Sequence, residues 1–349
     1  MCKEIYLMLT TACPNRCKYC YINHNQVHKS MTFEQCVDII ETNNPDRVIF
    51  FGGEPLLKID LIEEVLAYYH SLESRPRFQI VTSTMANFGK FIEVHKKYPL
   101  DEIQLSFDGF VSSRINTEGH SIDNTVAQNI RFFADLDLKA DISCVINEEN
   151  VNEIDDIHKM FVNWKKLTKG KISGQFIIAH DPNHTDKFFE VLAEKFPKTL
   201  DLDKLYRFHL NNIIAYLQRD KNYANCDAGK YSVFTPDGRE TFCTALSQEY
   251  GVDFSSELLQ HPCTHKDCQR CQYKILCDGG CRYERYKIYG DNWENNYLVN
   301  TCKLTKIIYD SIKNFIDNLS RQDMLELYSI IEDYRVYLKY YHSEEETNV

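Results

Sequence analysis

The sequence predicts an α/β fold in which a partial, TIM-like (β/α)6 barrel is followed by a small cysteine-rich domain and C-terminal helices. Three observations lead to this prediction. Short apolar runs alternate with amphipathic stretches over residues 1–182, cysteines crowd residues 226–302, and two more amphipathic stretches close the chain. Six successive β/α units imply a parallel sheet with right-handed crossovers, and six units rather than eight suggest a barrel that does not close.

The expected elements of the barrel alternate in order along the chain. Each short apolar run is followed by a stretch whose apolar residues recur at helical spacing. The expected strands are Ile5–Leu9, Val48–Phe51, Phe78–Val81, Ile103–Phe107, Ile142–Ile146 and Gln175–Ile178. The expected helices are Phe33–Ile40, Ile59–His70, Phe88–Lys97, Asn124–Ala134 and Val151–Trp164. Thr32 and Gln35 have the spacing of a capping box, which marks the start of the first helix.

Beyond the barrel, the sequence predicts three segments. Residues 183–225 are expected to form a helical connector. Residues 226–302 are expected to form an irregular domain, because they contain too few periodic apolar residues to hold together without metal. Residues 303–349 are expected to form two packing helices and a frayed tail, with Ser320 as the cap between the helices.

Composition and charge exclude several classes of protein. The chain has 349 residues, and 40 Lys and Arg face 51 Asp and Glu, which gives a formal net charge of −11. A surface that binds phosphate backbones usually carries the opposite sign. No apolar run reaches the roughly 20 residues of a membrane-spanning helix, and the N-terminus lacks a signal-peptide pattern. We therefore expect a cytoplasmic protein with neither a nucleic-acid nor a membrane partner.

The chain contains 14 cysteines, and their spacing points to metal. A reducing compartment argues against a disulfide framework. Cys13, Cys17 and Cys20 form a C-x3-C-x2-C triplet directly after the first expected strand. Three thiolates from one short loop suit a [4Fe–4S] cluster whose fourth iron is open to a ligand that is not protein. A zinc site with a distant fourth ligand is the alternative.

Two further loops at expected strand ends carry polar groups. Gly52-Gly53-Glu54 follows the second strand, where paired glycines let the backbone approach a ligand and the carboxylate can receive an ammonium group. Ser106 and Asp108 end the fourth strand on one face, and Arg114 follows. Taken alone, Gly52-Gly53-Glu54 is better explained by a turn, and Asp108 is explained equally well by one. The carboxyl ends of parallel strands are where ligands gather, so all three loops lie where a functional site is expected.

Together these motifs resemble the radical SAM superfamily. The cysteine triplet with Tyr19 inside it, the Gly52-Gly53-Glu54 run and the Ser106-Phe107-Asp108-Gly109 run occur in the matching order. The resemblance implies that S-adenosylmethionine (SAM) binds the open iron and is cleaved reductively to a 5′-deoxyadenosyl radical, which takes hydrogen from a substrate. It assigns cofactor contacts to Tyr19, to Gly52, Gly53 and Glu54 for the amino group, and to Ser106, Asp108 and Arg114 for the ribose and carboxylate. Thr82-Ser83-Thr84 departs from the Thr-Asn-Gly that relatives often carry.

The later cysteines resemble the SPASM extension of a subset of that superfamily. Their order follows the pattern CX9–15GX4C, then CX2CX5CX3C, then a final C. The resemblance implies two auxiliary [4Fe–4S] clusters, three clusters in all. The outer one would use Cys268, Cys271, Cys277 and Cys302, and the inner one Cys226, Cys243 and Cys281. The inner cluster would have an open iron or take Cys263, Asp227 or substrate as its fourth ligand. A zinc-bound ribbon is the alternative.

Members of the superfamily that carry SPASM mostly modify peptides. We therefore expect modification of a ribosomally made peptide, by a thioether or carbon–carbon crosslink, epimerisation or oxidation, with a flavodoxin- or ferredoxin-type electron donor. Thr244 stands where sulfatase-maturing members carry Asp, which disfavours formylglycine formation. Twelve residues precede Cys13, so we expect leader recognition by a separate protein or by the barrel. An amino-acid or other small-metabolite substrate, or a redox relay without radical chemistry, are the alternatives. No catalytic acid or base stands out.

Overall fold

The structure is a computed structural model. It describes residues 4–22, 24, 27–111, 113–179, 181, 183–218, 231–245, 263–277 and 279–342. The chain divides into two compact units. The first unit comprises residues 1–145, 163–174 and 228–259, and the second comprises residues 146–162, 175–227 and 260–349.

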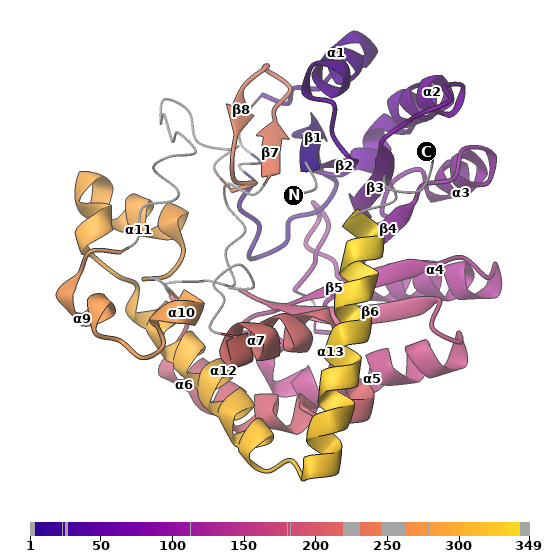
Figure 1. The fold of residues 1–349 in the computed structure, drawn as a ribbon. Helices are drawn as coiled ribbons and strands as arrows, with labels where there is room; N and C mark the ends of the chain where they lie inside the picture. The colour runs from indigo at the N-terminus through magenta and orange to yellow at the C-terminus, as the bar shows by residue number, and fades with distance from the viewer. Residues whose placement is uncertain are drawn as a thin grey trace. The chain divides into compact units, whose positions relative to one another are not determined.

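An eight-stranded sheet has the order β6-β5-β4-β3-β2-β1-β7-β8 (Figure 1). Its strands are β1 (Glu4–Thr10), β2 (Arg47–Gly52), β3 (Arg77–Thr82), β4 (Glu102–Ser106), β5 (Ala140–Ile146), β6 (Ile172–Ile178), β7 (Tyr231–Phe234) and β8 (Glu240–Thr241). Pairing is parallel from β1 through β5 and between β1 and β7, whereas β8 returns antiparallel to β7. All six expected strands are present, and the α/β fold with a largely parallel sheet is confirmed.

Strand β7 was not expected from the sequence, which predicted an irregular segment at these residues. It pairs with β1 in register from Glu4 opposite Tyr231 to Leu7 opposite Phe234. Val233 is fully buried against a cluster that includes Met8. A run of four residues is too short to stand out as a strand in the sequence, so the pairing depends on a partner far away in the chain.

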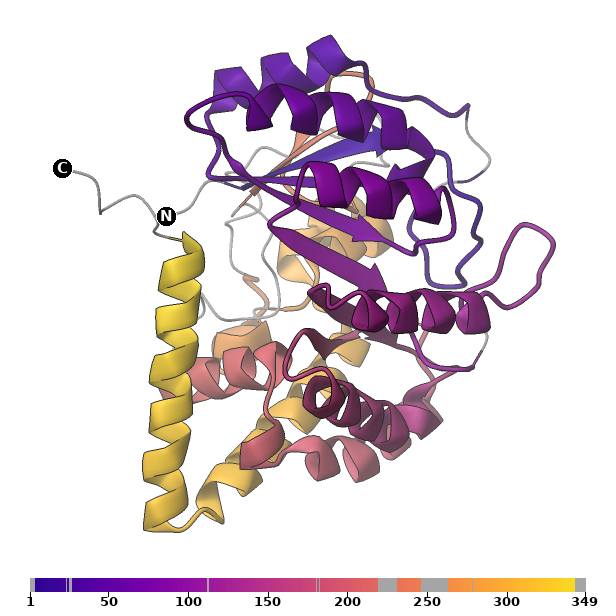
Figure 2. The same cartoon turned by 90° about the vertical axis from the view of Figure 1, so that its right-hand side faces the viewer.

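Helices follow most strands, and two of them, α2 and α3, begin and end where expected. The helices are α1 (Phe33–Asn43), α2 (Ile59–His70), α3 (Phe88–Lys97), α4 (Asp123–Asp135), α5 (Ile154–Leu167), α6 (Asp186–Lys195), α7 (Arg207–Gln218), α9 (Lys266–Gln269), α10 (Lys274–Cys277), α11 (Arg282–Tyr289), α12 (Val299–Asp317) and α13 (Arg321–His342). Short 3-10 helices are η1 (Pro55–Lys58), η2 (Val151–Glu153), η3 (Phe196–Thr199), η4 (Leu202–Lys204) and η7 (Gly290–Asn295). Figure 2 shows α1, α2 and α3 side by side on one face of the strands. Among the described residues, no helix combines the length and apolarity needed to cross a membrane.

The predicted helix caps are present at both ends of the chain. Thr32 Oγ1 accepts from the Gln35 N–H at 3.3 Å, and the Gln35 side chain accepts from the Thr32 N–H at 2.9 Å. Ser320 and Asp323 make the same reciprocal pair before α13, at 3.1 Å each. We expected the first C-terminal helix to begin after Cys302, but α12 begins at Val299, so that Cys302 lies in its first turn.

Two cysteines outside the metal motifs are packing residues. Cys36 on α1 and Cys144 on β5 are fully buried, and burial raises the pKa of each thiol. They lie among apolar neighbours of the first unit, whose core includes Leu7, Phe50 and Leu105. Cys2 lies outside the described residues.

Two buried histidines in the second unit make stability sensitive to acid. His158 on α5 and His209 on α7 are 5% and 0% exposed, and their rings lie 6.1 Å apart. Burial, reinforced by His158, lowers the pKa of His209 to about 3. Burial, reinforced by Lys204, lowers the pKa of His158 to about 4. Because the unfolded chain takes up protons near pH 6.5 and the folded chain does not, stability falls as the pH drops below 6.5.

We expect the free energy of unfolding to fall by about 2 kcal/mol for each of these histidines between pH 7 and pH 5. Urea unfolding of the metal-free protein at both pH values measures this loss. His209→Gln should remove about half of it, whereas His120→Gln should not, because the His120 side chain is 76% exposed. Equal losses in the wild type and His209→Gln would contradict the assignment.

Candidate functional site

The cysteine loop begins at the carboxyl end of β1 and is held by its neighbours. Cys13, Cys17 and Cys20 are free and partly exposed, and the Cys20 N–H donates to the Cys17 carbonyl at 3.0 Å. Asn15 is 2% exposed, and its Nδ2 donates to Ser83 Oγ at 2.8 Å. The structure therefore brings the three predicted ligands together on one loop. Sequence reasoning missed Asn15, because an asparagine between cysteines carries no signal of its own.

The thiols of this loop are suited to bind iron with release of protons. Burial raises the pKa of Cys13 to about 12 and that of Cys17 to about 11, and it raises the pKa of Cys20 as well. The thiols are therefore neutral near pH 7 in the metal-free protein. Since a metal binds the thiolate, loading would expel these protons. Three convergent thiols fit the donor set of a cluster with one open iron.

The glycines after β2 are required by close contact with the chain that leads into the cysteine loop. The Gly53 N–H donates to the Thr10 carbonyl at 2.8 Å, and the Glu54 N–H donates to the Ala12 carbonyl at 2.9 Å. A Cβ on Gly53 would lie 2.0 Å from the Ala12 oxygen, and one on Gly52 would lie 2.4 Å from the Thr10 oxygen. The two loops are thus joined backbone to backbone, and only glycine allows this approach.

The Glu54 carboxylate is buried and fully hydrogen-bonded. It is 1% exposed, and it accepts from the Leu56 N–H, the Thr82 hydroxyl, and both the N–H and the hydroxyl of Ser83. Burial raises its pKa, and these hydrogen bonds oppose that shift. Glu54 therefore ties the loop after β2 to the end of β3. An ammonium group bound at Glu54, as the sequence predicts, would share the same oxygens with these donors.

Thr82-Ser83-Thr84, which stands where relatives often carry Thr-Asn-Gly, has an unusual backbone conformation at Thr84. Thr84 has φ +62, a left-handed conformation that costs a β-branched residue about 1–2 kcal/mol and that glycine adopts freely. Its N–H donates to Thr82 Oγ1 at 2.9 Å, and Asn129 Nδ2 donates to its carbonyl and hydroxyl. These contacts hold Thr84 where relatives often carry glycine.

Asp108 gathers two other predicted residues around a buried carboxylate. It is 1% exposed and accepts from the Tyr19 hydroxyl and from the Val145 N–H, the latter at 2.8 Å. Arg114 Nε lies 2.8 Å from Asp108 Oδ2. The Arg114 guanidinium lies over the Tyr19 ring, and its Nη1 is 4.0 Å from Cys17 Sγ. Tyr19, Asp108 and Arg114 therefore form one ion-paired group beside the cysteine loop.

Burial, aided by the Asp108 charge, raises the pKa of Tyr19 well above its ordinary value, so the phenol keeps its proton and donates. Burial lowers the pKa of Arg114, but the Asp108 charge outweighs that effect and the net shift is upward. Arg114 thus remains a cation beside Cys17. Ser106, the remaining predicted contact, is the last residue of β4 and lies opposite Ser143 of β5.

A second group of cysteines converges in the second unit. Cys268, Cys271, Cys277 and Cys302 line one cavity together with Gly279. Three of them also face an adjoining recess of about 490 Å³. Burial raises the pKa of Cys268 to about 12, and a hydrogen bond to Cys277 raises the pKa of Cys302. The four predicted ligands of the outer auxiliary cluster are thus brought together. Among the described residues, no group of three or more His, Cys, Asp or Glu side chains is arranged so that it could hold a single metal ion.

The family model described as the radical SAM superfamily matches residues 7–161, which contain the cysteine loop, the Gly52-Gly53-Glu54 run and the Asp108 group. Residues 7–161 thus form a radical SAM domain.

Known relatives of this radical SAM protein include a cyclopropyl synthase and a peptide cyclase. It is 34% identical to the radical SAM cyclopropyl synthase TigE of Paramaledivibacter caminithermalis, over 36% of this chain and 31% of that protein. It is 20% identical to the PqqA peptide cyclase of Bradyrhizobium diazoefficiens, over 82% of this chain and 83% of that protein. The first curated relatives align over only 48% and 31% of their own lengths.

Its fold is similar to that of anSMEcpe solved with bound AdoMet and the Kp18Cys peptide. The TM-score is 0.66 at 16% identity, and the match covers 90% of this chain and 99% of that one. At this identity the likeness shows the fold alone. The partial barrel of the radical SAM protein is thereby confirmed.

The expected inner cluster of the radical SAM protein stays a prediction. Cys226 and Asp227 lie outside the described residues. Cys243 belongs to the first unit and Cys281, which precedes α11, to the second. Within the first unit, the Thr244 hydroxyl is hydrogen-bonded to that of Tyr21, directly after Cys20. Cys263, proposed as an alternative ligand, is buried and hydrogen-bonded to Cys268.

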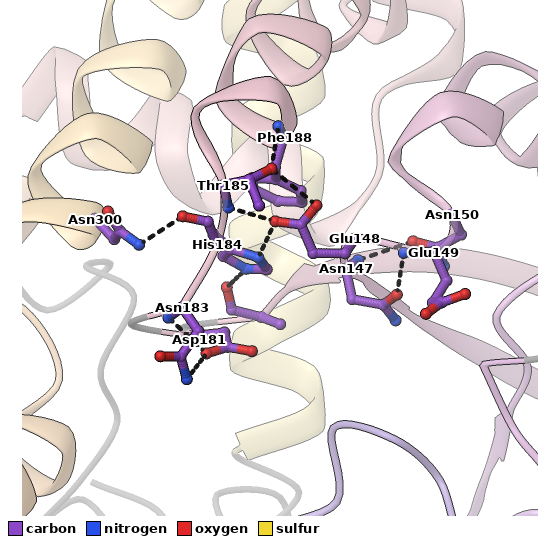
Figure 3. A network of polar contacts seen from close by, with 11 residues as sticks. Asn147, Glu148, Glu149, Asn150, Asp181, Asn183, His184, Thr185, Phe188 and Asn300 are labelled. Carbon is purple, nitrogen blue, oxygen red and sulfur yellow. Dashed lines mark hydrogen bonds and ion pairs between the residues drawn. The ribbon is translucent and has the colours of Figure 1, made fainter.

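A polar network that sequence reasoning missed joins the ends of β5 and β6 in the second unit (Figure 3). The His184 ring stacks on Phe188 with centroids 3.8 Å apart, and its nitrogens face the Ala179 carbonyl at 2.9 Å and Glu148 at 3.3 Å. Asn300 on α12 donates to the His184 carbonyl at 3.0 Å. The network anchors the helix that carries Cys302 to the loop after β6. Its only sequence signal is that polar residues follow these two strands.

Proposed function

We propose that this radical SAM protein cleaves SAM reductively and uses the resulting 5′-deoxyadenosyl radical to abstract hydrogen from a peptide. The observation that carries the proposal is the joining of three loops in the first unit. The cysteine loop is hydrogen-bonded to the Gly53 segment through its lead-in residues, and Tyr19, inside that loop, bonds to Asp108. The name of PqqA peptide cyclase and the peptide-bound form of anSMEcpe support a peptide substrate.

Bound at Cys13, Cys17 and Cys20, a [4Fe–4S] cluster would supply the electron and an open iron for SAM. The chain's own residues would orient the cofactor. Gly53 would let the backbone lie against its amino group, because no side chain intervenes. Arg114 would offset negative charge near Cys17, since its guanidinium stays protonated beside Asp108. Burial of these groups would keep water from the reacting atoms.

We further propose that the reaction is a crosslink, epimerisation or oxidation in a ribosomally made peptide. Two auxiliary [4Fe–4S] clusters would serve it, one at Cys268, Cys271, Cys277 and Cys302, and one at Cys226, Cys243 and Cys281. A flavodoxin- or ferredoxin-type protein would supply electrons, and a separate protein or the barrel itself would recognise a leader. Convergence of the first four cysteines around one cavity supports the outer site.

The test is anaerobic reconstitution with iron and sulfide, followed by dithionite and SAM. We expect release of 5′-deoxyadenosine, measured by chromatography, and iron bound to the protein. Cys17→Ala should release none, whereas Cys36→Ala should still release it, because Cys36 is a buried packing residue. A colourless zinc protein, or cleavage by Cys17→Ala equal to the wild type, would refute the proposal.

The substrate class is tested by isotope transfer. Candidate peptides encoded beside this chain, deuterated at carbon, should pass deuterium into 5′-deoxyadenosine and show a changed mass. Transfer from a free amino acid or another metabolite, and not from a peptide, would favour the small-substrate alternative and contradict peptide modification.

A further inference from the structure

Arg285, on α11 in the second unit, is a buried cation whose hydrogen bonding is incomplete. Its side chain is 0% exposed. Nη1 donates to the Asn296 carbonyl at 3.3 Å, and the guanidinium lies 5.0 Å from the Trp293 ring centroid. Nε and Nη2 are buried and find no acceptor among the described residues. A buried charge left without an anion is strongly unfavourable, so the fold must offer this guanidinium a negative partner.

The guanidinium lies directly behind the wall of the cysteine cavity. Gly279 lines that cavity with Cys277 and Cys302. A Cβ on Gly279, which has φ +86, would lie 2.9 Å from Arg285 Nη1 and 2.8 Å from Cys263 Sγ. Glycine is therefore required here, because it lets Arg285 and the cavity approach each other with only backbone between them.

Contacts lead from Arg285 to the predicted iron ligands. Cys263 Sγ donates to the Asn296 carbonyl, at 3.5 Å, which also accepts from Arg285, and Cys263 is hydrogen-bonded to Cys268. On the other side, the Arg285 N–H donates to the Cys281 carbonyl at 3.0 Å, one helical turn earlier. Since helix side chains lean toward the N-terminus, the Arg285 stem leans toward Cys281.

The walls of the recess also carry an excess of positive charge. Lys274 and Lys306 line the cavity. Lys303, whose charge is offset by its ion pair with Asp186, lines the adjoining recess, where Asp267 is the acidic member. An iron–sulfur cluster with four thiolate ligands carries net negative charge, which suits this surrounding. Of these cations, Arg285 is the buried one, so solvent would screen its field least.

We propose that Arg285 is the buried counter-charge of an auxiliary cluster bound by Cys268, Cys271, Cys277 and Cys302, and that it raises the cluster's reduction potential. The inference rests on the proposed function, which places a cluster at these cysteines. A fixed positive charge stabilises the reduced, more negative cluster over the oxidised one, and charge and hydrogen bonds near the sulfurs are what tune such potentials. Arg285 is a positioning residue in this scheme, because it acts on the cluster and not on substrate.

The test uses full-length protein with the Cys13→Ala, Cys17→Ala and Cys20→Ala background, which leaves only auxiliary iron. Redox titration followed by electron paramagnetic resonance gives midpoint potentials, and the signal lost in Cys271→Ala belongs to this cluster. With Arg285→Met we expect that signal at a more negative potential, and with Arg285→Lys a smaller shift. Lys287→Met removes the same charge from an exposed position of the same helix and should leave the potential unchanged.

Each outcome distinguishes a counter-charge at Arg285 from a residue that only packs. Iron lost in Arg285→Met but kept in Arg285→Lys supports the counter-charge, because the charge then retains the cluster. If Arg285→Met keeps its iron with an unchanged potential, or if both variants lose iron equally, the proposal is wrong. Arg285 then serves only to pack the fold. If the background protein binds no iron that depends on Cys271, the proposed auxiliary cluster is absent. That result refutes this part of the proposed function, independently of any change at Arg285.

Discussion

Gly53→Ala should lower the rate of SAM cleavage by about 100-fold, because it forces apart the two loops that would hold the cofactor. The added methyl would stand 2.0 Å from the Ala12 carbonyl oxygen, a backbone atom that cannot swing aside. Relief requires movement of the Gly53 segment or of the chain just before Cys13. The measurement is anaerobic release of 5′-deoxyadenosine by reconstituted protein, with iron content determined on the same sample.

Gly89→Ala is the matched control for this substitution. Gly89 lies in α3, and a Cβ there meets nothing within 4 Å. We expect unchanged cleavage and a gain in stability of up to about 1 kcal/mol, because alanine favours a helix over glycine. Cleavage by Gly53→Ala at the Gly89→Ala rate would show that the close approach at Gly53 is not needed.

Asp108→Asn should cost about 3–5 kcal/mol of folding free energy, because it removes one partner of a buried ion pair. Arg114 is 8% exposed and would keep its charge without the carboxylate 2.8 Å from Nε. The Tyr19 hydroxyl would lose the charged acceptor it now has. Urea unfolding of the metal-free protein under reducing conditions measures the loss.

Two comparisons separate the ion pair from a general effect of losing a charge. Asp60→Asn removes a carboxylate that is 87% exposed in its pair with Lys90, and should leave stability nearly unchanged. Arg114→Met combined with Asp108→Asn should be more stable than Asp108→Asn alone, since no unpaired charge is then buried. A loss in Asp108→Asn no larger than in Asp60→Asn would rule out the buried pair as a source of stability.

The sequence predicted best what depends on neighbouring residues. Helices α2 and α3 begin and end at the expected residues, and the capping box of Thr32 and Gln35 is present. Both follow from apolar periodicity and cap chemistry, which act over a few residues. The convergence of Cys13, Cys17 and Cys20 was predictable for the same reason, because one short loop carries all three.

Contacts between distant segments could not be predicted in this way. Glu54 is bonded by Thr82 and Ser83, and Asn15 reaches the same Ser83 across 68 positions of sequence. No local pattern marks such partners, since hydroxyls and amides occur in every loop. In the sequence, Arg285 cannot be distinguished from an ordinary surface arginine in an amphipathic stretch. Only the fold shows that it is buried behind Gly279. The sequence thus predicted the cysteines expected to bind iron better than it predicted the groups that surround them.

The location of Cys302 on a long helix implies an order of maturation. Helix α12 has 19 residues and buries Leu304, Ile308 and Ile312, so it can fold by packing alone. Cys268 and Cys277 lie on helices of only four residues, which are too short to persist by themselves. With a cluster bound as proposed, the chain would present Cys302 on a surface formed beforehand, and the short segments would close around the metal afterwards. Iron binding would then be the last step in the folding of this region. When iron is scarce, folding of the region would stop at this step.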